Sequence, residues 1–322
     1  MANTTDAKNP ALDDDDVLPP PPTIWKRMWS FAKKQPLGTG GLLLVVSFGL
    51  MAVFADLVTV HDPRSGEFFD QFTAPLSVSE MSGTYYILGT DEFGRDVYAR
   101  IIYGARTALI VGIVCAFVGS TIGLVLGVAS AYFGGWTDTI FQRLMDILMA
   151  FPLIILALTI VIASRAFMQI LEVENPSAYS IYFVIIAITI PFIPKCARVV
   201  RSSALSIREI PFIDAARANG FSHTRIIMRH MVPNVMAPFL IMVTAFVGQA
   251  ILLEASLSYL GLGVQEPTPA WGLMLRSAQE FMRDEPYLAI LPGLAITLAV
   301  FGFNLFGDAV RDALDPRLRS QS

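Results

Sequence analysis

Six long stretches without an ionisable side chain constrain this chain more than any other feature of its sequence. They cover residues 36–55, 107–137, 147–164, 175–194, 231–253 and 286–307. An α-helix rises about 1.5 Å per residue, so about 20 apolar residues cross the roughly 30 Å of hydrocarbon in a bilayer. Strands of an outer-membrane barrel would instead show segments of about 10 residues with alternating polarity. The sequence therefore predicts an all-α polytopic membrane protein with six transmembrane helices.

The composition agrees with a membrane protein and excludes a water-soluble domain and a disulfide-rich protein. Charged residues make up 16% of the chain, against about 25% in a typical soluble domain. The two cysteines, Cys115 and Cys196, lie within or beside the second and fourth stretches, which excludes a disulfide framework. The three histidines show no metal-binding spacing. We therefore expect no metal site.

The first 35 residues differ from the rest of the chain. They contain an Asp run at 13–16 and a Pro run at 19–22, a composition that is unable to bury a core. Trp25, Trp29 and the lysines at 33–34 then precede the first apolar stretch, as an interfacial anchor would. We expect a disordered tail with an anchor at 1–35 and a transmembrane domain at 36–319.

The distribution of Lys and Arg predicts the orientation. With the N-terminus inside, the inner segments hold 16 of these residues and the outer segments hold 7. This arrangement obeys the positive-inside rule and the opposite one violates it. We therefore expect both termini in the cytoplasm, an external segment at about 57–105 and a basic cytoplasmic loop at about 197–234.

The basic loop carries the clearest local signals of structure. Pro211 suits the first turn of a helix, and Asp214 near that end interacts favourably with the helix dipole. Gly220 suits a left-handed stop, and Ser222 can cap a second helix. The first of these helices is rich in alanine, which would let another protein approach closely. We therefore expect two short helices with a bend, exposed to the cytosol.

This loop resembles the "EAA" loop of ABC-importer permeases. The residues that carry the resemblance are Asp214, Ala215, Ala216, Gly220 and Pro233. The family usually begins the motif with Glu, so Asp214 is a conservative departure that keeps the charge and shortens the side chain.

Further blocks narrow the resemblance to the dipeptide, oligopeptide and nickel importers, and to their "C"-type permease subunit. The external block is formed by Gly89, Thr90, Asp91, Gly94, Arg95 and Asp96. Residues 254–263 and 304–318 are also similar to that family. The resemblance covers about residues 36–319 and leaves out the acidic, proline-rich tail.

The resemblance implies a division of labour among several proteins. A second homologous permease would complete the translocation path, two ATP-binding subunits would dock on the basic loop, and a solute-binding protein would dock outside. The partner subunits would hold ATP and Mg, so this chain itself would bind no cofactor and catalyse no reaction. Its place would be the bacterial inner membrane. Asp214 would help hold the loop at the ATPase, and Ala215, Ala216 and Gly220 would allow close approach.

An ion- or proton-coupled secondary transporter is the alternative function. Such transporters commonly show inverted repeats and broken helices, and no repeat is evident in this sequence. The chain is unable to hydrolyse ATP through a P-loop, because none of its five lysines follows a glycine. Nothing in the sequence indicates nucleic-acid binding. The resemblance favours peptides as the solute, while nickel chelates, glutathione, opines and sugars stay open.

Two acids deserve separate interpretation because they lie within or against the hydrocarbon. Such residues usually face a cavity or a partner. Asp146 lies three residues after Arg143, so we expect a structural ion pair between them in preference to a proton relay. Glu254 has no obvious partner nearby in sequence, and we expect its hydrogen bonds to come from another helix. Its role stays open.

Small residues and prolines mark the apolar stretches. Gly119, Gly123 and Gly127 form a GxxxGxxxG pattern on one helical face, which lets two membrane helices approach closely. Packing within one bundle is the favoured interpretation, and a subunit interface is the alternative. Prolines such as Pro191 and Pro194 are expected at the ends of the spans.

Overall fold

The computed structural model describes residues 33, 35–172, 175 and 179–314. The described residues from 37 to 314 form one compact unit. The predictions of a disordered tail and an interfacial anchor lie almost wholly outside the described residues.

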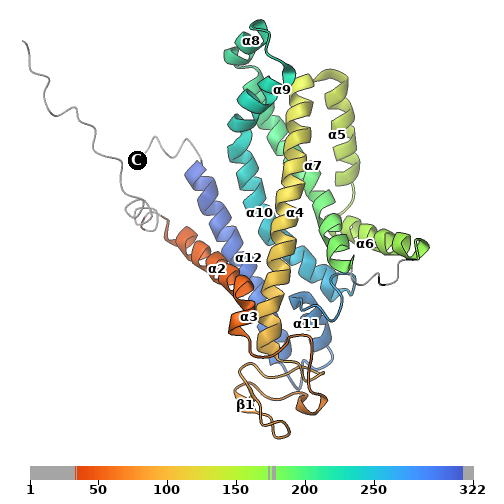
Figure 1. Cartoon of the computed structure of the whole chain (residues 1–322). Coiled ribbons are helices and arrows are strands. Elements are labelled where there is room, and N and C mark those ends of the chain that lie inside the picture. Colours follow the sequence, from red (N-terminus) through yellow and green to blue (C-terminus); the bar gives the residue numbers. More distant parts are fainter. Residues whose placement is uncertain (1–32, 34, 173–174, 176–178, 315–322) are drawn as a thin grey trace, which may run out of the picture. The chain divides into compact units, whose positions relative to one another are not determined.

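The prediction of six membrane helices is confirmed. Within the described residues, six helices are long and apolar enough to cross a membrane. They are α2 (Pro36–Val53), α4 (Val97–Phe133), α6 (Leu153–Ile170), α7 (Ser180–Arg208), the run His223–Tyr259 that ends in α10 (Met236–Tyr259), and α12 (Tyr287–Leu314). α4 runs through the middle of the bundle in Figure 1, while α2 and α6 are the least buried of the six.

Shorter elements connect these helices. They are α3 (Ala55–Val58), η2 (Phe68–Asp70), the antiparallel strands β1 (Ser77–Val78) and β2 (Tyr85–Tyr86), α5 (Gly135–Met149), α8 (Pro211–Ala218), α9 (His223–Ile226), η4 (Ile227–Met231), η5 (Val232–Val235) and α11 (Trp271–Ala278). The strands and α8 lie at opposite ends of the bundle (Figure 1). We call these the β1 end and the α8 end.

Several predicted boundaries shift. α4 begins at Val97, directly after the N-cap Asp96, so the segment before it ends at 96 and not at 105. α7 continues to Arg208 and therefore includes the first part of the basic loop expected at 197–234. Pro191 and Pro194 lie inside α7 instead of at its end, because membrane helices tolerate proline where neighbouring groups satisfy the freed carbonyls.

The glycine pattern forms the seam between α4 and α7. A Cβ added at Gly119 would lie 3.0 Å from the Cβ of Phe192, one at Gly123 would lie 2.7 Å from the Cβ of Cys196, and one at Gly127 would lie 2.5 Å from the carbonyl oxygen of Ala197. The backbones therefore touch where only hydrogen atoms fit. Packing within the bundle, the favoured interpretation, is confirmed.

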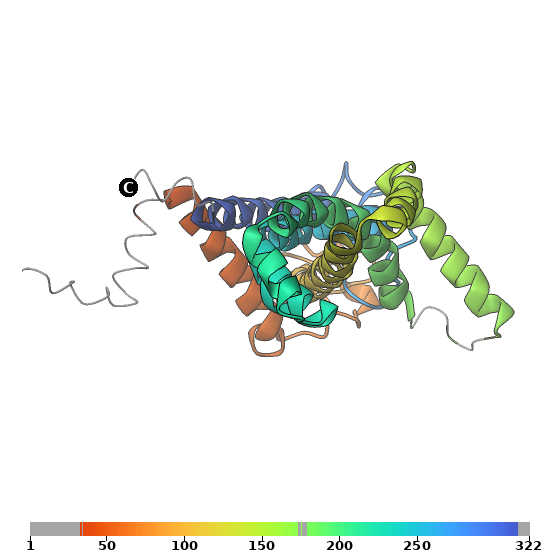
Figure 2. The ribbon, with the colours of Figure 1, turned by 90° about the horizontal axis from the view of Figure 1, so that it is seen from above.

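Other contacts extend this core. The rings of Phe192 and Phe246 stack at 4.3 Å and join α7 to α10. Cys115 and Cys196 are buried and free, which agrees with the expected absence of a disulfide. Figure 2, seen from the α8 end, shows α6 projecting away from the helices that surround α4. Much of the apolar surface of α2 and α6 is thus left uncovered by the chain itself.

Candidate functional site

The segment from Pro211 to Ser222 folds as its sequence predicts. Pro211 opens α8 after the extended residue Ile210. Gly220 ends the helix with φ of +73°, and the N–H groups of Gly220 and Phe221 donate to the carbonyls of Arg217 and Ala216 at 2.9 and 3.2 Å. This is the Schellman arrangement, in which a glycine takes the left-handed position. Ser222 then accepts a hydrogen bond from the N–H of Arg225 and caps α9.

The two faces of α8 differ in exposure. Ile213 and Ala216 are buried, whereas Asp214, Ala215 and Gly220 are exposed. The sequence interpretation grouped Ala216 with the exposed alanines, and the structure corrects this because Ala216 lies on the inward face. Asp214 pairs with Arg217 of its own helix at 3.3 Å. The free face of α8 is small and carries few long side chains apart from this pair.

The helix pair is anchored to the end of α4. The Tyr132 hydroxyl lies 2.8 Å from Nδ1 of His223, and the Arg217 guanidinium lies over the Tyr132 ring at 5.3 Å. Ile226 of α9 and Met231 of η4 are fully buried below this contact. The helix pair is therefore connected to α4 through the Tyr132 contacts and to α10 through the continuous chain.

Pro233 has a different place from the other loop residues. It is exposed and lies in η5, the short 3₁₀ turn that leads into α10. Proline fits the first turn of such an element because its nitrogen needs no hydrogen-bond acceptor. Pro233 therefore shapes the start of α10 and is not part of the α8 surface.

At the β1 end, Asp91 organises the turn that precedes α4. Its Oδ1 accepts hydrogen bonds from the N–H groups of Phe93 and Arg95, each at 2.9 Å, and its Oδ2 accepts one from Nε of Arg95 at 2.7 Å. Asp96 then caps α4 by accepting from the N–H of Tyr98 and also contacts His61 at 2.7 Å. The block therefore sets the direction in which α4 begins.

Gly89, Gly94 and Thr90 of this block pack closely against the chain at residues 67–73. Gly89 and Gly94 have φ of +77° and +70°. A Cβ on Gly94 would lie 1.9 Å from the carbonyl oxygen of Glu67, so no other residue fits there without movement. Thr90 is buried and accepts from the N–H of Thr73 at 2.8 Å.

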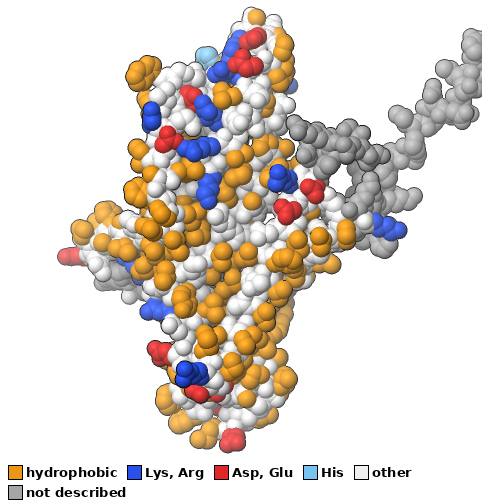
Figure 3. Space-filling model, turned by 180° about the vertical axis from the view of Figure 1, so that it is seen from behind, with side chains coloured by type: hydrophobic (Ala, Val, Ile, Leu, Met, Phe, Trp, Pro, Cys, Tyr) orange, Lys and Arg blue, Asp and Glu red, His pale blue; other side chains and the backbone are white. Residues whose placement is uncertain are grey.

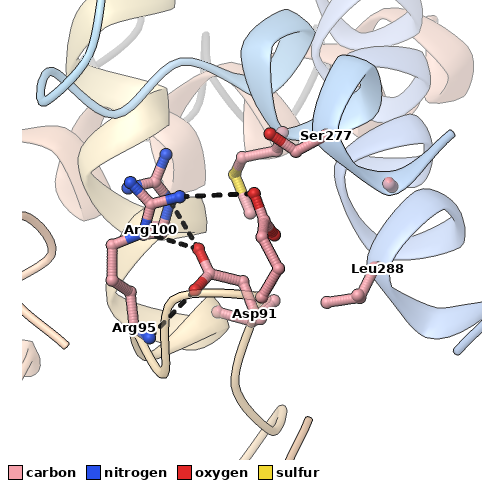
Figure 4. Close-up of a pocket in the computed structure, with 9 residues that line it drawn as sticks. Asp91, Arg95, Arg100, Ser277 and Leu288 are labelled. Atoms are coloured by element: carbon pink, nitrogen blue, oxygen red, sulfur yellow. Dashed lines mark hydrogen bonds and ion pairs between the residues drawn. The ribbon is translucent and has the colours of Figure 1, made fainter. Parts of the chain in front are cut away.

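Arg95 and Arg100 extend the block to the segment between α10 and α11. Glu266 of that segment accepts from Arg95 at 2.9 Å and from Arg100 at 3.1 Å. Figure 4 shows both arginines beside the Asp91 carboxylate. A cavity beside them, lined by Asp91, Arg95, Arg100, Ser277 and Leu288 among others, has a volume of about 10 Å³, which is room for about one water molecule. This cluster joins two chain segments and is too closed to hold a solute.

A second carboxylate holds the strands of the same end. Burial by itself raises the pKa of Asp70, but hydrogen bonds from Ser79, Ser82 and Tyr86 outweigh it and lower this pKa below its usual value. Burial and the Asp70 contact raise the pKa of Tyr86 to about 12. Both groups therefore keep one protonation state at neutral pH, which makes this hydrogen-bond network structural.

The two acids at membrane depth have partners that the sequence did not predict. Asp146 of α5 pairs with Arg198 of α7 and not with Arg143, because α5 lies beside α7. Glu254 is buried and accepts a hydrogen bond from Ser258 at 2.7 Å. The expected partner on another helix is wrong, since residues four apart share one helix face.

Other functional contacts were missed because they join distant residues. Tyr132 and His223 are 91 positions apart, and Arg100 and Glu266 are 166 apart. Asp138 of α5 binds Arg201 of α7 through two hydrogen bonds of 2.6 and 2.5 Å, and this contact lowers the pKa of Asp138. Their only sequence signal is charge beside an apolar stretch. No group of metal ligands occurs among the described residues.

Comparisons with known proteins agree with these features. Residues 119–320 match the family described as binding-protein-dependent transport system inner membrane component. The chain is 38% identical to the dipeptide transport system permease protein DppC of Alkalihalophilus pseudofirmus, over 98% of this chain and 99% of the relative. It is 35% identical to the glutathione transport system permease protein GsiD of Pectobacterium atrosepticum, over 97% and 96% of the two chains.

Solved structures share the fold. The inward-facing methionine ABC transporter MetNI matches with a TM-score of 0.53 and 18% identity, over 67% of this chain and 96% of the other. The family match and the relatives support the ABC-importer interpretation over a secondary transporter. This multi-pass inner-membrane protein belongs to the family of binding-protein-dependent transport system inner membrane components and is a permease subunit of an ABC importer.

Proposed function

We propose that this chain is the "C"-type permease of an ATP-driven importer for peptides or related small solutes, and that α8 is its contact with an ATPase. The names of the relatives support the solute class. The observation that carries the ATPase contact is the exposed face of α8, with Asp214 and Ala215, anchored on α4 through Tyr132 and His223.

The mechanism follows from the anchoring. Closure of the ATPase dimer on ATP would push α8 and α9 as one body, because Ile213 of α8 and Ile226 of α9 are buried in the same hydrophobic core. Tyr132 would pass this motion to α4, whose 37 residues reach the external block at Asp96. The helices would then rock between inward-open and outward-open arrangements, as rigid-body alternating access requires.

The proposal also assigns an orientation in the membrane and a set of partner proteins. The α8 end and both termini would lie in the cytoplasm, and the β1 end would face the solute-binding protein outside. A second homologous permease and two ATP-binding subunits would complete the importer. Those subunits would hold ATP and Mg, and this chain would bind no cofactor or nucleic acid and would catalyse no reaction.

Two substitutions test the ATPase contact in the assembled importer. Ala215→Glu places a longer charged side chain on the exposed face, and Gly220→Leu strains a φ of +73° by about 1 kcal/mol or more. Both should abolish ATP-dependent peptide uptake while expression of the permease stays normal. Ala215→Ser is the size-matched control and should transport normally. Normal uptake in both test variants would refute the ATPase contact.

A second experiment tests the need for partners. The purified chain in lipid vesicles, without a second permease and ATPases, should show no ATP-dependent uptake of a radiolabelled dipeptide. Addition of the partner subunits and the binding protein should restore it. Robust uptake by the single chain would overturn the importer assignment.

A further inference from the structure

Lys195 lies in the middle of α7, and its charge has no partner among the described residues. α7 spans Ser180–Arg208 and is one of the six candidate membrane helices. The Lys195 side chain is half-buried and makes no hydrogen bond or ion pair with the described part of the chain. An ionised side chain at this depth is costly in lipid and usually faces a partner or a water-filled cavity.

The packing of α7 on α10 shows which way Lys195 faces. The N–H of Gln265, just after α10, donates to Ser180 at the start of α7, so the two helices are antiparallel. They touch at Phe192 and Phe246. In an antiparallel pair, the residues three positions after each contact residue turn to the same side. Lys195 and Gln249 therefore share one face.

Gln249 repeats the features of Lys195. It is half-buried, and no hydrogen bond connects its amide to the residues that the structure describes. It belongs to a helical stripe that this chain leaves uncovered, formed by Ala245, Gln249, Leu252, Ser256 and Tyr259. An unpaired amide at membrane depth is unfavourable against lipid. The stripe on α10 therefore continues the uncovered face that begins at Lys195, with Gln249 as its second polar group at membrane depth.

The same face contains a groove and a second cation. Leu252, Ser256 and Tyr259 line part of a mainly apolar groove of about 480 Å³ between α10, α11 and α12. Arg198, one turn after Lys195, forms an ion pair with Asp146. Of these two cations, Lys195 is therefore the one whose charge has no partner among the described residues. In Figure 3, basic and acidic side chains interrupt the hydrophobic surface of the helices.

We propose that this face lines the translocation path and that Lys195 binds the carboxylate of the passing solute. The inference rests on the proposed function, because peptides and related solutes carry a free carboxylate. The ammonium group of Lys195 would donate to that carboxylate. Gln249, which lies three residues after Phe246 and closer to the β1 end, would contact other polar groups of the solute. Lys195 and Gln249 would be hydrated only while the importer is assembled and open.

Uptake by the complete importer tests the carboxylate site. Variants Lys195→Arg, Lys195→Met and Lys195→Glu are compared in the native host with radiolabelled dipeptide, tripeptide and glutathione, each with a free carboxylate. Charge-assisted hydrogen bonds predict that Met lowers uptake about 10- to 100-fold, that Glu lowers it further, and that Arg retains most of it. Arg311→Met, which removes an exposed cation at the end of α12, is the control and should transport normally.

The outcomes separate the possible roles of Lys195. Normal uptake by Lys195→Met overturns the proposal. Loss of the second permease from the purified Met variant also overturns it, since Lys195 would then pair with an acid of that subunit. Absence of ATP-dependent uptake in the unmodified importer refutes the proposed function instead, whatever the variants do.

A thiol assay on the assembled importer gives a second test that does not depend on the rate of uptake. In Lys195→Cys, small anionic and cationic methanethiosulfonate reagents should both reach and label the thiol in the assembled importer, and dipeptide should slow the labelling. Labelling by neither reagent would place Lys195 in a dry interface and would contradict the proposal.

Discussion

The glycine seam between α4 and α7 predicts a graded loss of stability. Alanine at Gly119, Gly123 or Gly127 adds one Cβ, and its nearest neighbours would lie 3.0, 2.7 and 2.5 Å away. Ordinary contacts of this kind begin near 3.4 Å, so the helices must separate more at each step. Overpacking of a closed core costs about 1–3 kcal/mol. We expect about 1 kcal/mol at Gly119 and about 3 kcal/mol at Gly127, with Gly123 between them.

Thermal unfolding of the purified chain in detergent measures this series. With about 2–4 °C of midpoint per kcal/mol, the midpoint should fall by a few degrees for Gly119→Ala and by about 6–12 °C for Gly127→Ala. Gly49→Ala is the matched control, because nothing lies within 4 Å of a Cβ at Gly49 in α2. It should be neutral or slightly stabilising, as alanine is the better helix former. Equal midpoints for Gly127→Ala and Gly49→Ala would refute the packing argument.

Three further predictions concern the two ends of the bundle. A thiol at the exposed residue Met81 should react with a membrane-impermeant reagent in intact cells, whereas one at Ser222 should react only after permeabilisation; the reverse pattern would invert the topology. Because hydrogen bonds lower the pKa of Asp70, their stabilisation is complete above about pH 4 and is lost as pH falls through the folded pKa. Proteolysis of the β1 end should therefore accelerate below about pH 4 and stay constant between pH 5 and 7. Glu266→Ala leaves the buried Arg100 with a carboxylate at 3.6 Å and should lower stability by about 1–3 kcal/mol, measured as a fall in the thermal midpoint, while Glu266→Gln should cost less.

The sequence predicts most of the secondary structure because its signals are local. Membrane spans follow from apolar length, and α8 follows from Pro211, Gly220 and Ser222 within a dozen residues. The α4–α7 seam could be anticipated because glycines four apart share one face. The boundaries were less accurate. The predicted spans stop at the first charged residue on each side. The helices are longer, because α4 begins before Arg100 and α7 continues past Arg198.

The contacts of charged residues were the least predictable part. Asp146 was assigned to its neighbour Arg143, but the tertiary packing of α5 on α7 brings Arg198 closer. Glu254 had a local signal in Ser258, four positions later on the same helix, although its hydrogen bonds were expected to come from another helix. The clamp of Arg95 and Arg100 on Glu266 joins segments far apart in sequence. No local pattern specifies such a pair, because it exists only after α10 and α4 have packed.

The ATPase contact at α8 is the central claim, and site-specific photo-crosslinking tests it most directly. A benzophenone amino acid replaces the exposed aromatic residue Phe212 of α8, or Met81 at the β1 end as a control, and the assembled importer is irradiated in native membranes. The account predicts a covalent adduct with the ATP-binding subunit from position 212 and none from position 81. An ATPase adduct from position 81, or its absence from position 212 in an importer that still transports, would contradict the account.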